Sequence, residues 1–258
     1  MQAILSDIHS NILALDAVLT DIAKHEIEEV ICLGDIIGYG PNPGECIDRA
    51  MDFDVVLRGN HEQALLVQIE GAGFNTKARG SIDWTRKQLD VRSEQREKNA
   101  KRWDFLDEAL RERYEDDNAL FVHGTPREPI CEYLRPRDIY NRGKMEDLFA
   151  RIEHLCFVGH THVSGIWTEE MVFETASEVA YEYEITEQKT FINPGSVGQP
   201  RDGDVRASYL LFDGSKVVWR RVPYSVEETA KNIRDVDQLD PFLAERLLAG
   251  RSIRSVRL

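Results

Sequence analysis

Histidine, aspartate and asparagine side chains follow the ends of several apolar runs in this sequence. Five of the seven histidines lie at such places, together with two aspartates and one asparagine. The set consists of Asp7, His9, Asp35, Asn60, His61, His123, His160 and His162. Imidazole nitrogens and carboxylate or amide oxygens suit divalent ions such as Mn, Fe and Zn. The sequence therefore predicts a metal centre with mixed nitrogen and oxygen ligands, in which the carboxylate of Asp35 is placed to bridge two ions.

The segments that must position these side chains alternate between strands and helices. Apolar runs at 3–7, 29–35 and 54–60 indicate buried strands, and helical patterns at 11–26 and 42–52 separate them. This β-α-β-α-β order is typical of a mostly parallel sheet covered by helices. Ligands of such sheets bind at the carboxyl ends of the strands, so the polar side chains are expected to meet at one edge. Burying so many of them without partners would cost several kcal/mol each, which again favours bound metal.

The rest of the chain predicts a second sheet and two groups of helices. The charge-rich segment at about 62–117 is interpreted as a solvated helical insertion, with a lid over the site as the alternative. Strands resume at 118–124 and 155–162, and six further strand signals at 164–223 predict a second, more antiparallel sheet. Residues 225–258 indicate two helices and an arginine-containing tail. We expect a single α/β domain made of two sheets.

Composition excludes several classes of protein. The net charge of −14 repels a phosphate backbone, so extended nucleic-acid binding is not expected, although bound metal could attract a small phosphate ester. The four cysteines form no C-x-x-C pair, which disfavours a disulfide framework and a zinc knuckle and favours the cytoplasm. No apolar run approaches twenty residues, and the N-terminus lacks a basic region, so neither a membrane span nor a signal peptide is expected.

Five motifs occur in a fixed order, each after a strand signal: D-x-H, G-D, G-N-H-E, V-H-G and G-H-T-H. In this order they resemble the calcineurin-like metallophosphoesterases, from Gln2 to about Arg206. The loop NPGSVGQPR is most similar to the small prokaryotic phosphodiesterase-like branch. The resemblance implies an αββα sandwich with mixed sheets and two divalent ions, Mn foremost, with Fe, Zn, Ni or Mg as alternatives. Its implied ligands are Asp7, His9 and His162 for one ion, Asn60, His123 and His160 for the other, and Asp35 as the bridge.

The same resemblance implies hydrolysis of a phosphate ester by in-line attack of a hydroxide that bridges the two ions. His61 would not bind metal but would orient or protonate the leaving alkoxide, as suits an imidazole pKa of about 6.5. Glu62 would cap a helix or orient His61. The candidates for substrate contact are Asn11, Tyr39, Arg58, Gly195, Ser196 and Arg201. Asn11 could instead cap a helix, and Arg58 could instead pair with Glu62.

Several functions fit this pattern. We favour a phosphodiesterase that acts on a small nucleotide-like substrate, with a phosphomonoesterase as an alternative. A protein phosphatase is disfavoured, because the Ser/Thr phosphatases of the superfamily carry Asp-Arg-Gly where this chain has Gly38, Tyr39 and Gly40. A non-catalytic scaffold for protein partners, similar to the retromer scaffold subunit, is also disfavoured. That subunit lacks the catalytic histidine, whereas this chain has His61 and every expected ligand. The sequence leaves the oligomeric state open and is compatible with a homo-oligomer.

Overall fold

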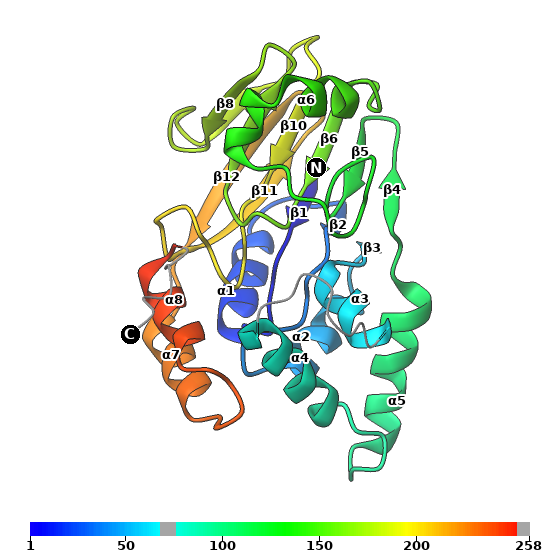
Figure 1. The fold of residues 1–258 in the computed structure, drawn as a ribbon, viewed down its shortest axis with the longest axis vertical. Helices are drawn as coiled ribbons and strands as arrows, with labels where there is room; N and C mark the ends of the chain where they lie inside the picture. Colours follow the sequence, from blue (N-terminus) through cyan, green and yellow to red (C-terminus); the bar gives the residue numbers. More distant parts are fainter. Residues whose placement is uncertain (68–75, 252–258) are drawn as a thin grey trace.

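Two β-sheets pack face to face in this computed structural model, which describes residues 1–67 and 76–251 (Figure 1). The first sheet contains, in spatial order, β3 (Val55–Val56), β2 (Glu29–Cys32), β1 (Gln2–Leu5), β11 (Ala207–Phe212), β12 (Lys216–Val222) and β9 (Glu182–Glu184). The second contains β4 (Arg113–Glu115), β5 (Ala119–Val122), β6 (Leu155–Val158), β10 (Thr190–Asn193), β7 (Gly165–Thr168) and β8 (Val172–Thr175). Each sheet mixes parallel and antiparallel neighbours, which confirms the expected sandwich of two mixed sheets.

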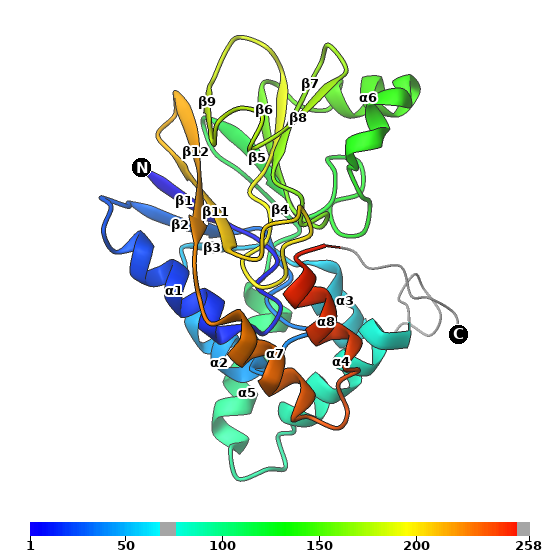
Figure 2. The ribbon, with the colours of Figure 1, turned by 90° about the vertical axis from the view of Figure 1, so that its left-hand side faces the viewer.

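Alternating side chains along the strands create three apolar layers. Ala3 and Leu5 of β1 face the helices α1 (Ile12–Ile22) and α2 (Pro43–Ala50), as the alternation of a strand requires. Ile4, between them in sequence, faces the other sheet and belongs to the core that the two sheets share. The outer face of the second sheet packs on α6 (Arg142–Phe149), which follows a short 3₁₀ turn at Pro136–Tyr140. The layers are therefore helix, sheet, sheet, helix, as Figure 2 shows from the side.

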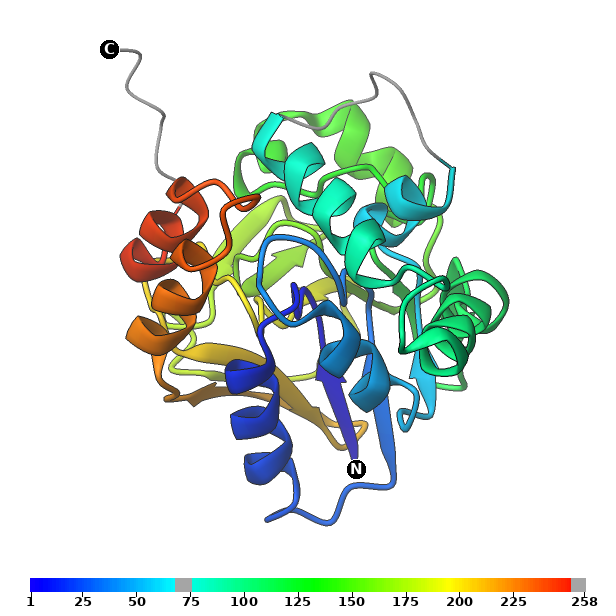
Figure 3. The same cartoon turned by 90° about the horizontal axis from the view of Figure 1, so that it is seen from below.

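Parallel pairing brings several strand ends to one edge of the sandwich. In the first sheet β1, β2 and β3 are parallel neighbours, and in the second β5, β6 and β10 are. Seen from below, the loop after β1 lies between the helices α7 (Val226–Arg234) and α8 (Phe242–Ala249) on one side and α3 (Asn60–Val67) and α4 (Thr76–Gln88) on the other (Figure 3). The loops at the carboxyl ends of these strands carry the polar motifs.

The helical segment is shorter than the 62–117 expected. It consists of α3, α4, α5 (Arg96–Asp104) and a π-helical turn at Phe105–Ala109, and it gives way to β4, which pairs antiparallel with β5. The strand forms because Tyr114 packs against the core between the sheets, a tertiary contact that charge patterning cannot reveal. Residues 68–75 of the expected insertion lie outside the described residues.

All six strand signals at 164–223 correspond to strands, but they do not form one sheet. Strands β7, β8 and β10 join the second sheet, whereas β9, β11 and β12 extend the first. The expectation that they build a second sheet by themselves was wrong. The reason is that β11 pairs antiparallel with β1, with Ala3 opposite Leu211, and so closes the first sheet from the C-terminal half of the chain.

The two expected C-terminal helices are present as α7 and α8. They pack on each other and share an apolar cluster with α4 and with Tyr39. Residues 252–258, including Arg254 and Arg257 of the expected tail, lie outside the described residues. Within residues 1–67 and 76–251, every helix is too short or too polar to cross a membrane.

Candidate metal centre

One half of the centre forms where the loops after β1 and β6 meet. His9 Nε2 lies 3.1 Å from His162 Nε2, and Asp7 Oδ1 lies 3.2 Å from the same His162 atom. Asp7 Oδ2 is occupied by the hydroxyl of Ser6 at 2.7 Å and the backbone N–H of His160 at 3.1 Å. Asp7 Oδ1 has no hydrogen-bond partner among the described residues although it is buried, so it remains available as a ligand atom.

The other half forms around His123, at the end of β5. His160 Nδ1 lies 3.2 Å and Asn60 Oδ1 lies 3.3 Å from His123 Nε2. Asp35, which follows β2, stands between the halves, because its Oδ2 lies 3.5 Å from His123 Nε2 and 3.6 Å from His9 Nε2. The structure thus brings together all seven side chains that the sequence suggested as ligands.

The hydrogen bonds of the imidazoles fix which nitrogen faces the centre. Four rings each place their outer nitrogen within hydrogen-bond distance of a backbone carbonyl oxygen. These pairs are His9 Nδ1 with Ile37 (3.0 Å), His123 Nδ1 with Leu33 (3.0 Å), His162 Nδ1 with Gln199 (2.6 Å) and His160 Nε2 with Cys131 (3.1 Å). A carbonyl only accepts, so each outer nitrogen carries a proton and each inner nitrogen of a neutral ring presents a lone pair. Lone pairs directed at one another about 3 Å apart need a cation, so this donor set fits divalent metal.

Electrostatics supports the same conclusion. Burial would raise the pKa of Asp7 and Asp35, but neighbouring histidines outweigh it and hold both pKa values well below the usual range. Burial lowers the pKa of His160 to about 3 and of His162 to about 4, so both rings are neutral at pH 7. Burial would lower the pKa of His123 as well, but Asp35 raises it to about 9. The centre therefore holds two carboxylates and attracts positive charge, which a proton on His123 supplies in part.

His61 lies inside this cluster, with Nε2 4.0 Å from Asp35 Oδ2 and its ring 4.7 Å from that of His9. Burial is the main cause that lowers the pKa of His61 well below 6.5, and it outweighs the opposing charge of Asp35. The expectation that His61 titrates near 6.5 was therefore wrong, because its site is desolvated. Its distances to His9 and Asp35 also place it within reach of a shared cation.

The loops that carry these side chains are held in a strained backbone conformation. The non-glycine residues with φ near +50° to +70° include Asp7 (55°), His9 (48°), Asp35 (54°), His160 (67°) and His162 (59°). Side chains other than glycine rarely occupy this left-handed region, and each such residue costs on the order of 1–3 kcal/mol. Such strain persists where the surroundings impose it, and its concentration at five polar residues marks a functional site.

Glu62 fixes two of these loops to each other. Its buried carboxylate accepts backbone N–H groups from Asp35 (2.9 Å), Gly59 (2.9 Å) and Ile37 (3.1 Å). The bond from Gly59 caps the first turn of α3, so the capping role expected for Glu62 is confirmed. The sequence did not predict that Glu62 also binds the backbone of the loop after β2. No local sequence signal connects the G-N-H-E motif to the backbone of the G-D motif.

Replacing Glu62 by alanine is expected to lower the free energy of unfolding by roughly 3 kcal/mol or more. Three buried N–H groups would lose their acceptor, and each unsatisfied donor costs about 1–3 kcal/mol. Urea unfolding of metal-free protein measures the change. Glu187→Ala, which removes an exposed carboxylate, is the matched control and should change stability by less than about 0.5 kcal/mol. A similar stability in both variants would contradict the role given to Glu62.

Three of the residues expected to contact substrate instead support the protein framework. Asn11 caps α1: its Oδ1 accepts the Ala14 N–H at 3.2 Å, and its amide donates to the Gly198 carbonyl oxygen at 2.9 Å. Ser196 is fully buried and donates to the Asp7 carbonyl oxygen at 2.8 Å. Gly195 adopts φ 85° and donates its N–H to the side chain of Asn193. Their polar groups are committed inside the protein, and contact of these three residues with substrate stays a prediction.

The other three candidates for substrate contact, Arg58, Tyr39 and Arg201, lie in different surroundings. Arg58 donates to the carbonyl oxygen of Asp107 at 2.8 Å and does not pair with Glu62, whose carboxylate holds backbone groups. Tyr39 packs its ring 4.5 Å from those of both His9 and His61. Arg201 lines a cavity of about 530 Å³ together with Tyr133, Arg135, Pro136, Arg137, Thr161 and Val163. Arg201 is thus the candidate that borders open space, whereas Tyr39 is buried against the rings of the metal centre.

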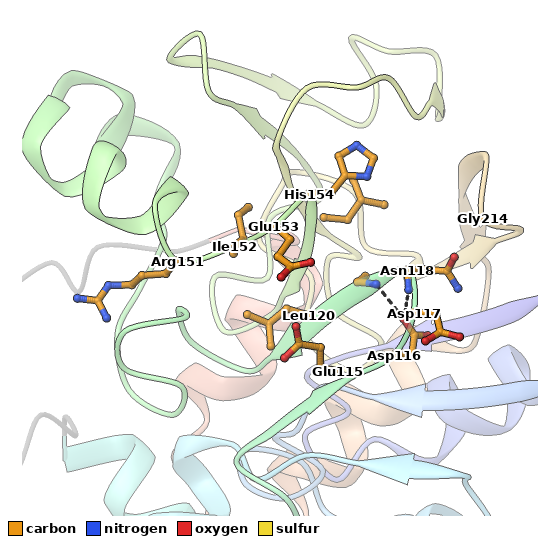
Figure 4. Close-up of a pocket in the computed structure, with 12 residues that line it drawn as sticks. Glu115, Asp116, Asp117, Asn118, Leu120, Arg151, Ile152, Glu153, His154 and Gly214 are labelled. Carbon is orange, nitrogen blue, oxygen red and sulfur yellow. Dashed lines mark hydrogen bonds between the residues drawn. The ribbon is translucent and has the colours of Figure 1, made fainter.

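A second hollow lies at the opposite ends of β5 and β6 (Figure 4). It has a volume of about 340 Å³, and its lining includes the carboxylates of Glu115, Asp116, Asp117 and Glu153. Carboxylates repel a phosphate ester, and no histidine ligand cluster lies there among the described residues. The cavity that contains Arg201 is therefore the better candidate for a phosphate-bearing substrate.

Comparisons with known proteins agree with this geometry. A sequence model of the calcineurin-like phosphoesterase superfamily domain matches residues 1–216. An uncharacterised protein of Methanocaldococcus jannaschii is 37% identical over 258 residues, covering 97% of this chain and 98% of the relative. The crystal structure of a metallophosphoesterase from Sphaerobacter thermophilus is similar with 36% identity and a TM-score of 0.77, over 96% of this chain and 98% of that one. A hypothetical protein from Pyrococcus horikoshii, 20% identical, shares the fold with a TM-score of 0.73 over 98% and 100% of the two chains.

Proposed function

Because the chain belongs to the calcineurin-like phosphoesterase superfamily, we propose that it hydrolyses a phosphodiester of a small nucleotide-like molecule with two divalent metal ions. The observation that supports two ions is the position of Asp35. Its carboxylate lies within reach of His9 on one side and of His123 on the other, and these belong to separate ligand clusters. One carboxylate between two sets of imidazoles is the arrangement that a bridged pair of ions needs.

The proposed ligands divide between the two halves of the centre. They are Asp7, His9 and His162 for one ion, Asn60, His123 and His160 for the other, and Asp35 for both. When bound, such ions stabilise charge on the phosphoryl oxygens and lower the pKa of water. The nitrogen and oxygen donor set suits Mn first, with Fe, Zn, Ni and Mg as alternatives.

The remaining residues act on the substrate. The lowered pKa of His61 favours its neutral form. The neutral ring stabilises the leaving oxygen by donating a hydrogen bond, not by placing a positive charge beside it. Arg201 attracts the anionic substrate, and Tyr133, whose ring lies 3.6 Å from that of His160, offers an aromatic surface for a flat leaving group. The arginines of the cavity favour a leaving group that is itself anionic or nucleotide-like. We also place the protein in the cytoplasm, because all four cysteines are free.

Hydrolysis of bis-p-nitrophenyl phosphate by chelator-stripped protein, before and after addition of Mn²⁺, tests the proposal. We expect activity only with metal, and lower activity towards p-nitrophenyl phosphate, which a phosphomonoesterase would prefer. Protein that binds two ions but hydrolyses neither ester, with any of the five metals, would favour the scaffold function instead.

A further inference from the structure

Arg246 of α8 is a buried arginine that forms no ion pair with any described residue. Arg246 is only 9% exposed. Neither its Nε nor its Nη2 atom has a hydrogen-bond partner in residues 1–67 and 76–251. Its guanidinium carbon lies 4.4 Å from the centroid of the Tyr39 ring. Burial of a charge without a partner is costly, so this arrangement suggests that a ligand completes it.

Arg201 lies beside the same ring and, among the described residues, donates to Gln199 but pairs with no carboxylate. Its guanidinium carbon lies 5.8 Å from the Tyr39 centroid, and its buried Nε has no hydrogen-bond partner in the described part of the chain. Burial and the charge of Arg201 together lower the pKa of Arg246 to about 10, which still leaves Arg246 charged at pH 7. Two arginines at one tyrosine ring, neither in an ion pair with a described residue, are notable in a chain whose net charge is −14.

The fold holds α8 so that the two arginines stay together. The Gly203 N–H, two residues after Arg201, donates to the Gly250 carbonyl oxygen at 2.8 Å, just after the end of α8. Leu243 and Leu247 of α8 belong to the apolar cluster that contains Tyr39. Figure 2 shows α8 between α7 and the helices α3 and α4, beside the loops of the metal centre. Arg246 is thus fixed by packing rather than placed on a mobile surface.

The arginine pair borders the metal centre. Tyr39, against which both arginines lie, packs on the rings of His9 and His61 at 4.5 Å. The backbone N–H of Arg201 donates to the carbonyl oxygen of His162 at 3.1 Å. This bond attaches the backbone of Arg201 to a loop of the metal centre. An anion held by these arginines would therefore lie near Tyr39, whose ring contacts two histidines of the centre.

We propose that Arg201 and Arg246 form an anion subsite for a second phosphoryl group of the substrate. The inference rests on the proposed phosphoesterase function and narrows its substrate class to phosphate esters that carry at least one further phosphoryl group. Guanidinium groups suit this task, because each offers several N–H donors in a fork that matches phosphate oxygens. The unpartnered Nε and Nη2 atoms of Arg246 would gain their missing acceptors from the bound phosphoryl group.

Calorimetric titration of chelator-stripped protein with tripolyphosphate, in the absence of divalent ions, tests the subsite. We expect wild-type protein to bind one tripolyphosphate and Arg246→Met to bind it at least about tenfold more weakly, since hydrogen bonds to charged groups are lost. Arg234→Gln removes the same charge from an exposed position on the neighbouring α7 and should stay within about twofold of wild type. Equal affinities of Arg246→Met and wild type, or no binding to wild type, would overturn the proposal.

Thermal melting of the same proteins separates a binding role from a structural one. Without tripolyphosphate, Arg246→Met should melt at or above the Tm of wild type, because an uncompensated buried charge has been removed. With tripolyphosphate, only wild type and Arg234→Gln should gain in Tm. A Tm of Arg246→Met well below that of wild type would assign the arginine to the framework and overturn the subsite. Both experiments omit metal, so failure of the phosphoesterase proposal would appear separately, in the Mn²⁺ assay.

Discussion

Replacing His61 by alanine is expected to lower kcat by roughly 10²–10⁴-fold while two metal ions per chain remain bound. The imidazole lies 4.0 Å from the proposed bridging carboxylate, and burial keeps its pKa well below 6.5. Its contribution is therefore a hydrogen bond to the leaving oxygen, not charge neutralisation. Steady-state kinetics measures the change, and elemental analysis of the dialysed protein measures metal content.

The leaving group distinguishes this role from a structural one. A p-nitrophenolate departs without assistance, whereas an alkoxide needs a donor, so the loss should be larger for an alkyl phosphodiester than for the p-nitrophenyl ester. His154→Ala removes a half-buried histidine whose ring lies within hydrogen-bond distance of the Thr186 carbonyl oxygen, far along the sheet from the metal centre, and should leave kcat unchanged. Loss of one metal ion from His61→Ala would show instead that His61 is a ligand, as its position near His9 and Asp35 allows.

Replacing Asp35 by alanine is expected to reduce metal content from two ions per chain to at most one and kcat by about 10³-fold or more. Asp35 is the carboxylate between the two halves of the centre, and metal stabilisation of the transition state is worth several kcal/mol. Without it, the inner nitrogens of His9 and His123 would no longer share an anionic neighbour. Metal analysis and Mn²⁺-dependent hydrolysis measure both effects.

Asp35→Asn provides the matched control for folding. Asp35 Oδ1 accepts the backbone N–H of His61 at 2.9 Å in the first turn of α3, and an amide oxygen can still accept that bond. We expect Asp35→Asn to fold and to unfold cooperatively in metal-free form while losing most activity. Full activity with two bound ions in this variant would contradict the bridging role of the carboxylate.

The positions of the polar cluster could be predicted from the sequence, because each member follows an apolar run and parallel strands share a carboxyl edge. Asp35 Oδ2 lies 3.6 Å from His9 Nε2 and 3.5 Å from His123 Nε2 for this reason. The assignment of β9, β11 and β12 to the first sheet could not be predicted. Alternation identifies a strand and its buried face, but it does not specify which sheet the strand joins.

The polar interactions around the centre were harder to predict than its members. Asn11 and Ser196 occur in motifs that suggest phosphate contact, yet their side chains hold loop backbones. Arg246 lies in the segment FLAERLLA, where a charged pair, Glu245 and Arg246, among apolar residues has the pattern of any amphipathic helix. Only the packing of α8 against Tyr39 shows that this arginine is buried. Such roles depend on tertiary contacts between distant segments.

The carbonyl oxygens that orient the imidazoles limit how this centre can change during evolution. They belong to Leu33, Ile37, Cys131 and Gln199. Every amino acid has a backbone carbonyl, so substitution at these four positions changes a side chain but leaves the acceptor in place. The choice of tautomer is thus insensitive to point mutation. A descendant of this protein that adopts another metal must therefore change the ligands themselves or remodel the loops.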